Sequence, residues 1–154
     1  MNALSAPAEI AAWRFLLSRY TWHWALTLTF RGRCGAGSGV VKRCRALLHM
    51  IEKDAYGRQW KSVRPAGLYW AFTLEPSSDG GIHIHVLLGF CVSPRREIRW
   101  RRIEAKWHII GGHFRHQRVW AGTGAIEYIT KSARWWRESA QLSDNLARVP
   151  PALA

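Results

Sequence analysis

Two runs of alternating residues, 68–75 and 81–90, restrict the fold of this chain more than any other feature. Both are rich in β-branched and aromatic residues, and a Pro-Ser-Ser-Asp-Gly segment separates them, which is typical of an antiparallel hairpin. Side chains alternate faces along a strand, so Glu75, His83 and His85 share one face and the large apolar residues share the other. With a turn centred on the aspartate, Glu75 lies opposite His83, with Cβ atoms roughly 5 Å apart, and diagonal to His85.

Two imidazoles and a carboxylate on one face form a ligand set that suits a divalent cation. Histidines alone on an exposed strand are often only solvated side chains. The carboxylate at the matching position favours a metal site instead. We therefore predict that Glu75, His83 and His85 bind a divalent metal, Mn²⁺ or Mg²⁺, and that water or substrate takes the remaining positions.

The charge of the chain points to nucleic acid as its partner. Its 154 residues carry a formal net charge of +13, and arginine, which grips phosphate bidentately and stacks on bases, far outnumbers lysine. No apolar run approaches the roughly 20 residues of a membrane-spanning helix, and no signal peptide opens the chain. We expect no membrane contact and a location in the cytoplasm, or wherever the host cell holds its nucleic acid.

Several cations and indoles are candidates for DNA contact. Arginine beside tryptophan is a plausible stacking platform for unpaired bases, although such indoles also often roof a core. The candidate nucleic-acid-binding residues are Arg31, Arg33, Arg95, Arg99, Arg102, Arg134 and Trp135. The three cysteines lack the spacing of a disulfide framework or a thiolate zinc site, so we expect them to be reduced packing residues.

The remaining segments complete an α+β pattern in a single domain. The apolar spacing predicts helices over 8–20, 39–56, 93–107 and 125–136, and strands over 22–30 and 113–120. Strand 22–30 carries small and polar residues on its odd positions, matching the histidine face of the hairpin. Residues 1–140 are expected to form the domain and residues 141–154 a flexible tail.

Tyr128 and Lys131 are neighbours on the surface of the last predicted helix, because they are three residues apart. A tyrosine can attack a phosphodiester, but its phenol, with a pKa near ~10, is a poor nucleophile without help. A nearby lysine and a metal at the phosphate would both favour the phenolate. A tyrosine and a lysine at this spacing are usually only exposed side chains without a role. Because this pair follows the hairpin with the predicted metal ligands, Tyr128 is a candidate nucleophile and Lys131 its candidate helper.

Together these features resemble the His-hydrophobic-His superfamily of single-strand endonucleases, and within it the rolling-circle replication initiators of small plasmids, phages and viruses. Residues 26–30, 82–88 and 128–131 are similar to the three family motifs, in their usual order. The resemblance implies an antiparallel sheet of about five strands with helices packed on it, similar to the RNA-recognition fold. It also implies Glu75, His83 and His85 as metal ligands, Tyr128 as the nucleophile and Lys131 as its helper.

The implied activity is a nick in single-stranded DNA at an origin, with an origin hairpin as the expected substrate. Attack by the tyrosine leaves a covalent 5′-phosphotyrosine, from which the strands are rejoined. The third motif holds one tyrosine, so the two-tyrosine cycle of some phage initiators is not supported. The helicase domain of many viral initiators is also missing, which makes a host helicase and polymerase the expected partners.

Two other functions stay open. A single-tyrosine transposase of a small insertion sequence shares the metal hairpin, but tends to carry glutamine four residues after the tyrosine, where this chain has Ser132. A relaxase is less favoured, since its tyrosine usually lies near the start. A non-catalytic module for single-stranded nucleic acid would need aromatic residues on the open sheet face, where this chain has small and polar residues and histidines.

Overall fold

The computed structural model describes residues 6–30, 38–63, 67–110, 112–120, 124–131 and 140–146. Its helices are α1 (Ala6–Ser18), α2 (Ser38–Tyr56), the 3₁₀ turn η1 (Gly57–Gln59), α3 (Trp60–Val63), α4 (Trp100–Ile110) and α5 (Ala125–Ile129). Its strands are β1 (Trp24–Thr29), β2 (Leu68–Pro76), β3 (Ile82–Phe90), β4 (Phe114–Arg118) and β5 (Gln141–Leu142). Over these residues, no helix is both long enough and apolar enough to cross a membrane.

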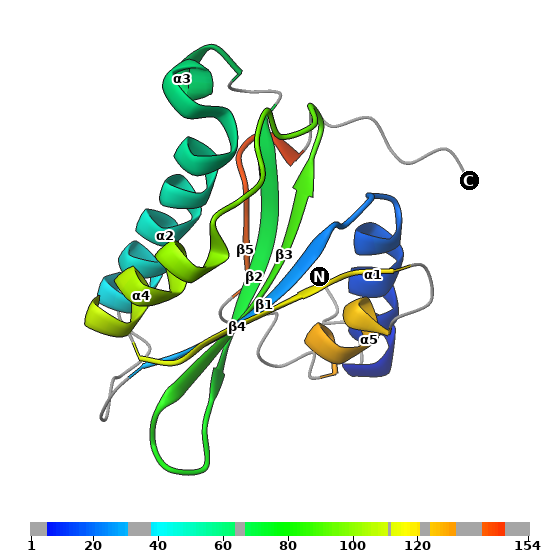
Figure 1. Cartoon of the computed structure of the whole chain (residues 1–154). Coiled ribbons are helices and arrows are strands. Elements are labelled where there is room, and N and C mark those ends of the chain that lie inside the picture. Colours follow the sequence, from blue (N-terminus) through cyan, green and yellow to red (C-terminus); the bar gives the residue numbers. More distant parts are fainter. Residues whose placement is uncertain are drawn as a thin grey trace.

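The five strands form one antiparallel sheet in the order β4-β1-β3-β2-β5, which confirms the predicted α+β class. The β2–β3 hairpin therefore lies inside the sheet, and its turn projects beyond the neighbouring strands (Figure 1). Helices α2, α3 and α4 lie on one side of the sheet, and α1 and α5 lie on the other (Figure 1). Both faces of the hairpin are thus covered along part of their length.

The larger core lies between the sheet and helices α2 and α4. Helix α2 forms because apolar residues recur at helical intervals, and its buried positions Cys44, Leu47 and Ile51 face the sheet. They meet the even-numbered side chains of the hairpin, such as Phe72 and Ile84, which are fully buried. This is the face on which the alternation predicted the core.

A second, smaller core covers part of the opposite face. Leu17 of α1, Leu87 of β3 and Ile129 of α5 are buried together there. Tyr69 of β2 also lies in this cluster, and its ring passes so close to Gly89 that a Cβ at that glycine would overlap it. The face that carries the histidines is therefore partly roofed by helices, whereas the alternation alone predicted it only as the polar face.

Three segments differ from their predicted structure. Helix α5 ends at Ile129, so Thr130 and Lys131 follow it instead of continuing the helix predicted over 125–136, and residues 132–136 lie outside the described residues. Helix α4 begins at Trp100 rather than near residue 93, because the preceding residues bind the end of α2: the amide of Arg95 donates to the carbonyl of Ala55 (3.0 Å), and the Arg96 side chain donates to the carbonyl of Asp54 (2.7 Å). Residues 141–146, predicted as part of a tail, instead pack on β2.

Strand β5 is very short and is fixed by its contacts with β2. The Ser143 amide donates to the Trp70 carbonyl (2.9 Å), and the Asn145 side chain donates to the Leu68 carbonyl (3.0 Å). Leu146 is buried in the second core. The rest of the predicted tail, residues 147–154, lies outside the described residues.

Two of the three cysteines lie in the described residues, and both are free thiols. Cys44 is fully buried in the larger core, and burial raises the pKa of its thiol. Cys91 is exposed. Cys44 thus confirms the predicted packing role, Cys91 does not pack in the core, and Cys34 lies outside the described residues.

Candidate active site

The turn of the β2–β3 hairpin sets the register that brings the candidate ligands together. The Gly81 amide donates to the Asp79 carboxylate (3.0 Å), and the Ser77 amide donates to the Gly81 carbonyl (2.9 Å). In the resulting register Glu75 pairs with His83, and Thr73 with His85. The predicted placement of Glu75 opposite His83 and diagonal to His85 is confirmed.

His85 lies at the centre of the site and is almost fully buried, at 2% exposure. Its Nε2 lies 2.9 Å from Oε2 of Glu75, and its Nδ1 lies 3.4 Å from the hydroxyl of Thr27 on β1. Burial lowers the pKa of His85 below its ordinary 6.5, although the hydrogen bond with Glu75 acts in the opposite direction. The imidazole is therefore neutral near pH 7, with Nε2–H donating to Glu75 and Nδ1 accepting from Thr27.

Helix α5 carries Tyr128 over this point of the sheet. Ile129 anchors the helix in the second core, and the Arg14 side chain of α1 donates to the hydroxyl of Thr130 (3.2 Å). The Tyr128 ring stands at 87° to the His85 ring, with 5.1 Å between centroids. Tyr128 is 53% exposed, so this side chain is open to solvent beside a buried imidazole.

Lys131 links the tyrosine to the carboxylate. Its Nζ lies 3.1 Å from Oε2 of Glu75 and 4.8 Å from the centre of the Tyr128 ring. The expected proximity of Lys131 and Tyr128 is therefore present, with the ammonium over the ring face. The same oxygen of Glu75 serves both His85 and Lys131, so the four side chains form one polar network.

The ligand set fits a divalent metal in its chemistry, although its present contacts are internal. Within the described residues, no group of three His, Cys, Asp or Glu side chains has the arrangement of a metal site. The His83 ring lies 6.4 Å from the His85 ring, and Glu75 is held by His85 and Lys131. Two imidazoles and a carboxylate nevertheless suit Mn²⁺ or Mg²⁺, with a preference for the softer ion.

The hydroxyl of Thr27, which was not among the predicted site residues, also suits His85 to metal binding. A hydroxyl both donates and accepts, so Thr27 can also accept from Nδ1–H of His85. That tautomer leaves Nε2 as a lone-pair donor, as a metal-bound histidine requires. The signal was present in the small, polar odd positions of strand 22–30, which were recognised as a matching face but not as partners of His85.

The structure describes three of the predicted DNA-binding residues, Arg95, Arg99 and Arg102. Arg95 and Arg99 precede α4 and Arg102 lies in its first turn, on the other side of the sheet from His85. The guanidinium of Arg99 already forms an ion pair within the protein. Both this group and the backbone amide of Arg99 donate hydrogen bonds to the Asp54 carboxylate of α2. Arg95 and Arg102 are exposed. Arg31, Arg33, Arg134 and Trp135 lie outside the described residues.

Arg115 of β4 is a candidate that sequence reasoning missed. It pairs with Thr27, which pairs with His85, so these residues form one row across the sheet on the same face. Arg115 is exposed. The alternation of strand 113–120 contained this signal, but the pairing of that strand with β1 could not be read from it.

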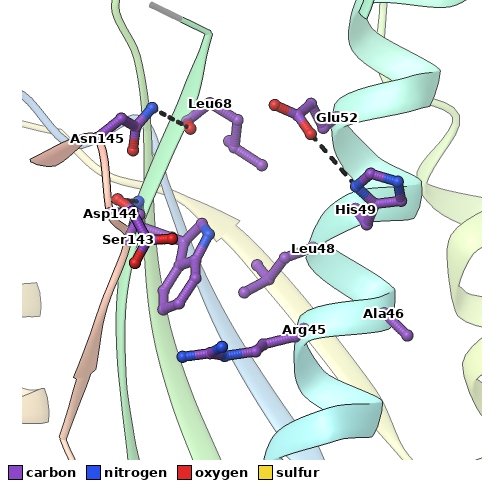
Figure 2. A pocket seen from close by; sticks show the side chains of 10 residues that line it. Arg45, Ala46, Leu48, His49, Glu52, Leu68, Ser143, Asp144 and Asn145 are labelled. Carbon is purple, nitrogen blue, oxygen red and sulfur yellow. Dashed lines mark hydrogen bonds and ion pairs between the residues drawn. The ribbon is translucent and has the colours of Figure 1, made fainter. Parts of the chain in front are cut away.

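A cavity of about 550 Å³ lies on the opposite side of the sheet, between α2 and the segment after β5 (Figure 2). Trp70 and Arg45 line it, with the guanidinium carbon 5.9 Å from the indole centre. Two carboxylates line it, Asp144 and Glu52, and Oε2 of Glu52 lies 3.4 Å from Nδ1 of His49. The sheet separates this cavity from Tyr128 and His85, so it is not part of the candidate active site.

Comparison with known proteins adds no family. No family model matches the chain, and no curated protein matches it. Among solved structures, the chain is similar to the crystal structure of the hypothetical protein ORF119 from Sulfolobus islandicus rod-shaped virus 1. That match has 14% sequence identity and a TM-score of 0.44, and covers 85% of this chain and 91% of the viral chain.

Proposed function

We propose that this protein is a metal-assisted endonuclease that nicks single-stranded DNA through Tyr128, in the manner of a rolling-circle replication initiator. One observation carries the proposal: an exposed tyrosine stands over a buried imidazole–carboxylate pair, and a lysine contacts both the tyrosine and the carboxylate. The proposed nucleophile and its helper cation come from α5 and the residues just after it, and the proposed metal donors come from the β2–β3 hairpin. Nucleic acid as the substrate is supported by the net charge of +13.

The reaction is a transesterification at phosphorus. The Tyr128 oxygen forms a bond to the phosphorus, the bond from phosphorus to the 3′ oxygen breaks, and the product is a 5′-phosphotyrosine with a free 3′-hydroxyl. The phenol proton passes to water, and the leaving oxygen takes up a proton. Lys131 lies next to the ring and stabilises the phenolate. The reverse attack by a 3′-hydroxyl rejoins the strand without a nucleotide cofactor.

Glu75, His83 and His85 would hold the divalent ion. When bound, the ion acts as a Lewis acid that polarises the scissile phosphate. Thr27 of the neighbouring strand β1 orients the His85 ring. The imidazole therefore keeps its direction when Glu75 leaves His85 to bind the ion. The low pKa of His85 favours the neutral imidazole, which is the form that binds a metal.

A covalent adduct tests the proposal directly. The protein is incubated with a pool of single-stranded oligonucleotides and Mn²⁺, and the products are separated by denaturing electrophoresis. We expect a protein–DNA band with wild type and with Tyr20→Phe, and none with Tyr128→Phe. Mass spectrometry should place the adduct on Tyr128 through a 5′ phosphate. Attachment to another tyrosine, or a 3′ linkage, would contradict the mechanism.

Metal binding has a readout of its own. Titration of Mn²⁺, followed by its electron paramagnetic resonance signal, should show one site that binds Mn²⁺ more tightly than Mg²⁺. His83→Ala should weaken the site by about 10–100-fold or more, as loss of supporting groups alone does elsewhere. His113→Ala is the matched control, since His113 is an exposed histidine outside the ligand set. Equal affinity in both variants would remove the metal from the proposal.

One observation favours a binding-only module as the second candidate: the Glu75 carboxylate already has two partners, His85 and Lys131. Such a module would bind DNA with the same affinity in chelator and in Mn²⁺ and would never give an adduct. The transposase alternative makes the same nick, so it differs in the DNA it recognises rather than in this site. The adduct experiment therefore separates enzyme from module, and the sequence of the captured DNA separates the two enzymes.

A further inference from the structure

A column of rings and cations lies along β4, the edge strand of the sheet. The imidazole of His116 lies nearly parallel to the indole of Trp100, at 15° and 4.7 Å between centroids. Trp24 of β1 is tilted against both rings, at 4.7 Å from Trp100 and 5.8 Å from His116. The guanidinium carbon of Arg118 lies 4.8 Å from the centre of Trp24. Stacked rings capped by a guanidinium have the geometry with which proteins hold unpaired bases.

Burial differs through the column in a way that leaves its outer end open. Trp24 and Trp100 are partly buried and pack against the larger core, which fixes their positions. His116 and Arg118 are exposed. Trp100 stacks on the His116 ring and Phe114 is tilted against it at 5.8 Å, so a planar group that stacks on the face of His116 away from Trp100 would extend the column by one ring.

Exposed positive charge is concentrated on α4 and β4, which both contribute rings to the column. Five exposed cations belong to these two elements, and within the described part of the chain none of them forms an ion pair: Arg101, Arg102, Lys106, Arg115 and Arg118. The neighbouring carboxylate of Glu104 lies 3.6 Å from His108 and is near enough to His116 to act on its pKa against the effect of burial, so one carboxylate lies beside the column. A partner of high negative charge fits this surface, and stacking rings restrict that partner to one with exposed bases.

The edge strand presents cations on both faces of the sheet. His116 and Arg118 project on the side of α4, whereas Arg115 projects on the side of His85, because neighbouring residues alternate faces. Arg115 and His85 lie two strands apart, or roughly 10 Å at the usual strand spacing. A polymer that crosses this edge therefore meets positive charge before, at and after the crossing.

We propose that single-stranded DNA crosses the β4 edge, with one base stacked on His116 and with Arg118 and Arg115 bound to the phosphates on either side of that base. The direction of the strand toward Tyr128 rests on the proposed function; the stacking site itself requires only that the protein binds unpaired DNA. The site belongs to the described residues and is distinct from the cations named from the sequence.

Anisotropy of a labelled oligonucleotide in chelator tests the stacking site without chemistry. His116→Ala should lower affinity roughly tenfold, as loss of one stacked base contact does elsewhere. His116→Phe should retain affinity, because a phenyl ring stacks without a charge. Gln117→Ala is the matched control: it is exposed, adjacent and on the opposite face. On an abasic strand of equal length, wild type and His116→Ala should bind alike.

Three results would overturn the proposal. They are unchanged affinity in His116→Ala, an equal loss on the abasic strand, and duplex DNA that competes as well as the single strand. Circular dichroism checks that each variant is folded. The adduct experiment on Tyr128 is independent: a protein that stacks DNA here but forms no adduct keeps this site and loses the nicking reaction, and the reverse result does the opposite.

Discussion

The two faces of the sheet bury different kinds of side chain. Under α2 and α4 the strands bury apolar groups only, such as Phe72 and Ile84, and the polar residues buried on that side lie on α2 or, for Ser143, just after β5. Under α1 and α5 the sheet buries Thr73 and His85, and Thr130, which follows α5, is also buried there. Buried polar groups contribute less to stability than apolar ones and demand partners. The apolar face therefore contributes most of the stability. On the other face, burial lowers the pKa of His85 and restricts its orientation.

The sharpest test of this contrast lies within the polar face. His85→Ala should abolish adduct formation and also lower the free energy of unfolding by about 1–3 kcal/mol, because Thr27 and Glu75 lose a buried partner. His83→Ala should abolish the adduct with little change in stability, since His83 is only half-buried. Urea unfolding with and without Mn²⁺, beside the gel assay, measures both. Alternation placed both histidines on the polar face of the hairpin, and the burial of His85 is what distinguishes the two variants in stability.

A change on the apolar face should have the opposite profile. Phe72→Ala removes a fully buried ring that stacks on Trp70 at 5.1 Å, and should cost about 3–5 kcal/mol of stability. Adduct formation per folded molecule should stay near wild type at low temperature. A folded Phe72→Ala protein with no adduct activity would show that the two faces are coupled more tightly than their contacts indicate.

Asp54 tests the contact that places α4 on the apolar side. Burial alone would raise its pKa, but hydrogen bonds from Arg99 hold the pKa of this carboxyl below its ordinary 3.8. A lowered folded-state pKa means that the contribution to stability is present above about pH 4 and is lost as the pH falls through the folded value. Asp54→Asn should cost about 1–2 kcal/mol at pH 7 and should be less sensitive to acid than wild type. If the free energies of unfolding of the two proteins fell equally as the pH was lowered, Asp54 would not be the source of this pH dependence.

The smallest expected effect concerns two arginines that are near in sequence. Arg102 is exposed, so Arg102→Gln should reduce the salt slope of DNA binding by about 0.7 log units if it meets one phosphate. Arg99→Gln should change stability more than the salt slope, because Arg99 is bonded to Asp54. Affinities measured from 50 to 200 mM salt decide it. Equal slope changes would mean that the Asp54 contact opens when DNA binds.

The hairpin could be predicted residue by residue because its order is local. Alternation fixed the faces and a short turn fixed the register, so the positions of Glu75, His83 and His85 followed. The same logic gave the strand beside it and helix α2, whose apolar spacing is regular over its whole length. The fold class followed from these elements together.

What could not be predicted depends on contacts between distant segments. Strand β5 is too short to show a period and exists through hydrogen bonds from Ser143 and Asn145 to β2. The late start of α4 depends on Asp54 of another helix. Two contacts at the candidate site likewise join separate segments. They are the ion pair between Glu75 and Lys131 and the hydrogen bond between His85 and Thr27. Spacing predicts which side chains share a face, but not which of them touch.

The hairpin also has a consequence for the order in which the protein folds. Its contact between Glu75 and His85 spans 10 residues, whereas the contact that ties α5 to α1, between Arg14 and Thr130, spans 116. Hairpins close in roughly microseconds, while contacts of long sequence separation form late. The face that carries His85 should thus form before Tyr128 docks on it, so that a half-folded chain lacks the complete candidate site. Pulsed hydrogen exchange would contradict this if the amides of α5 gained protection before those of β3.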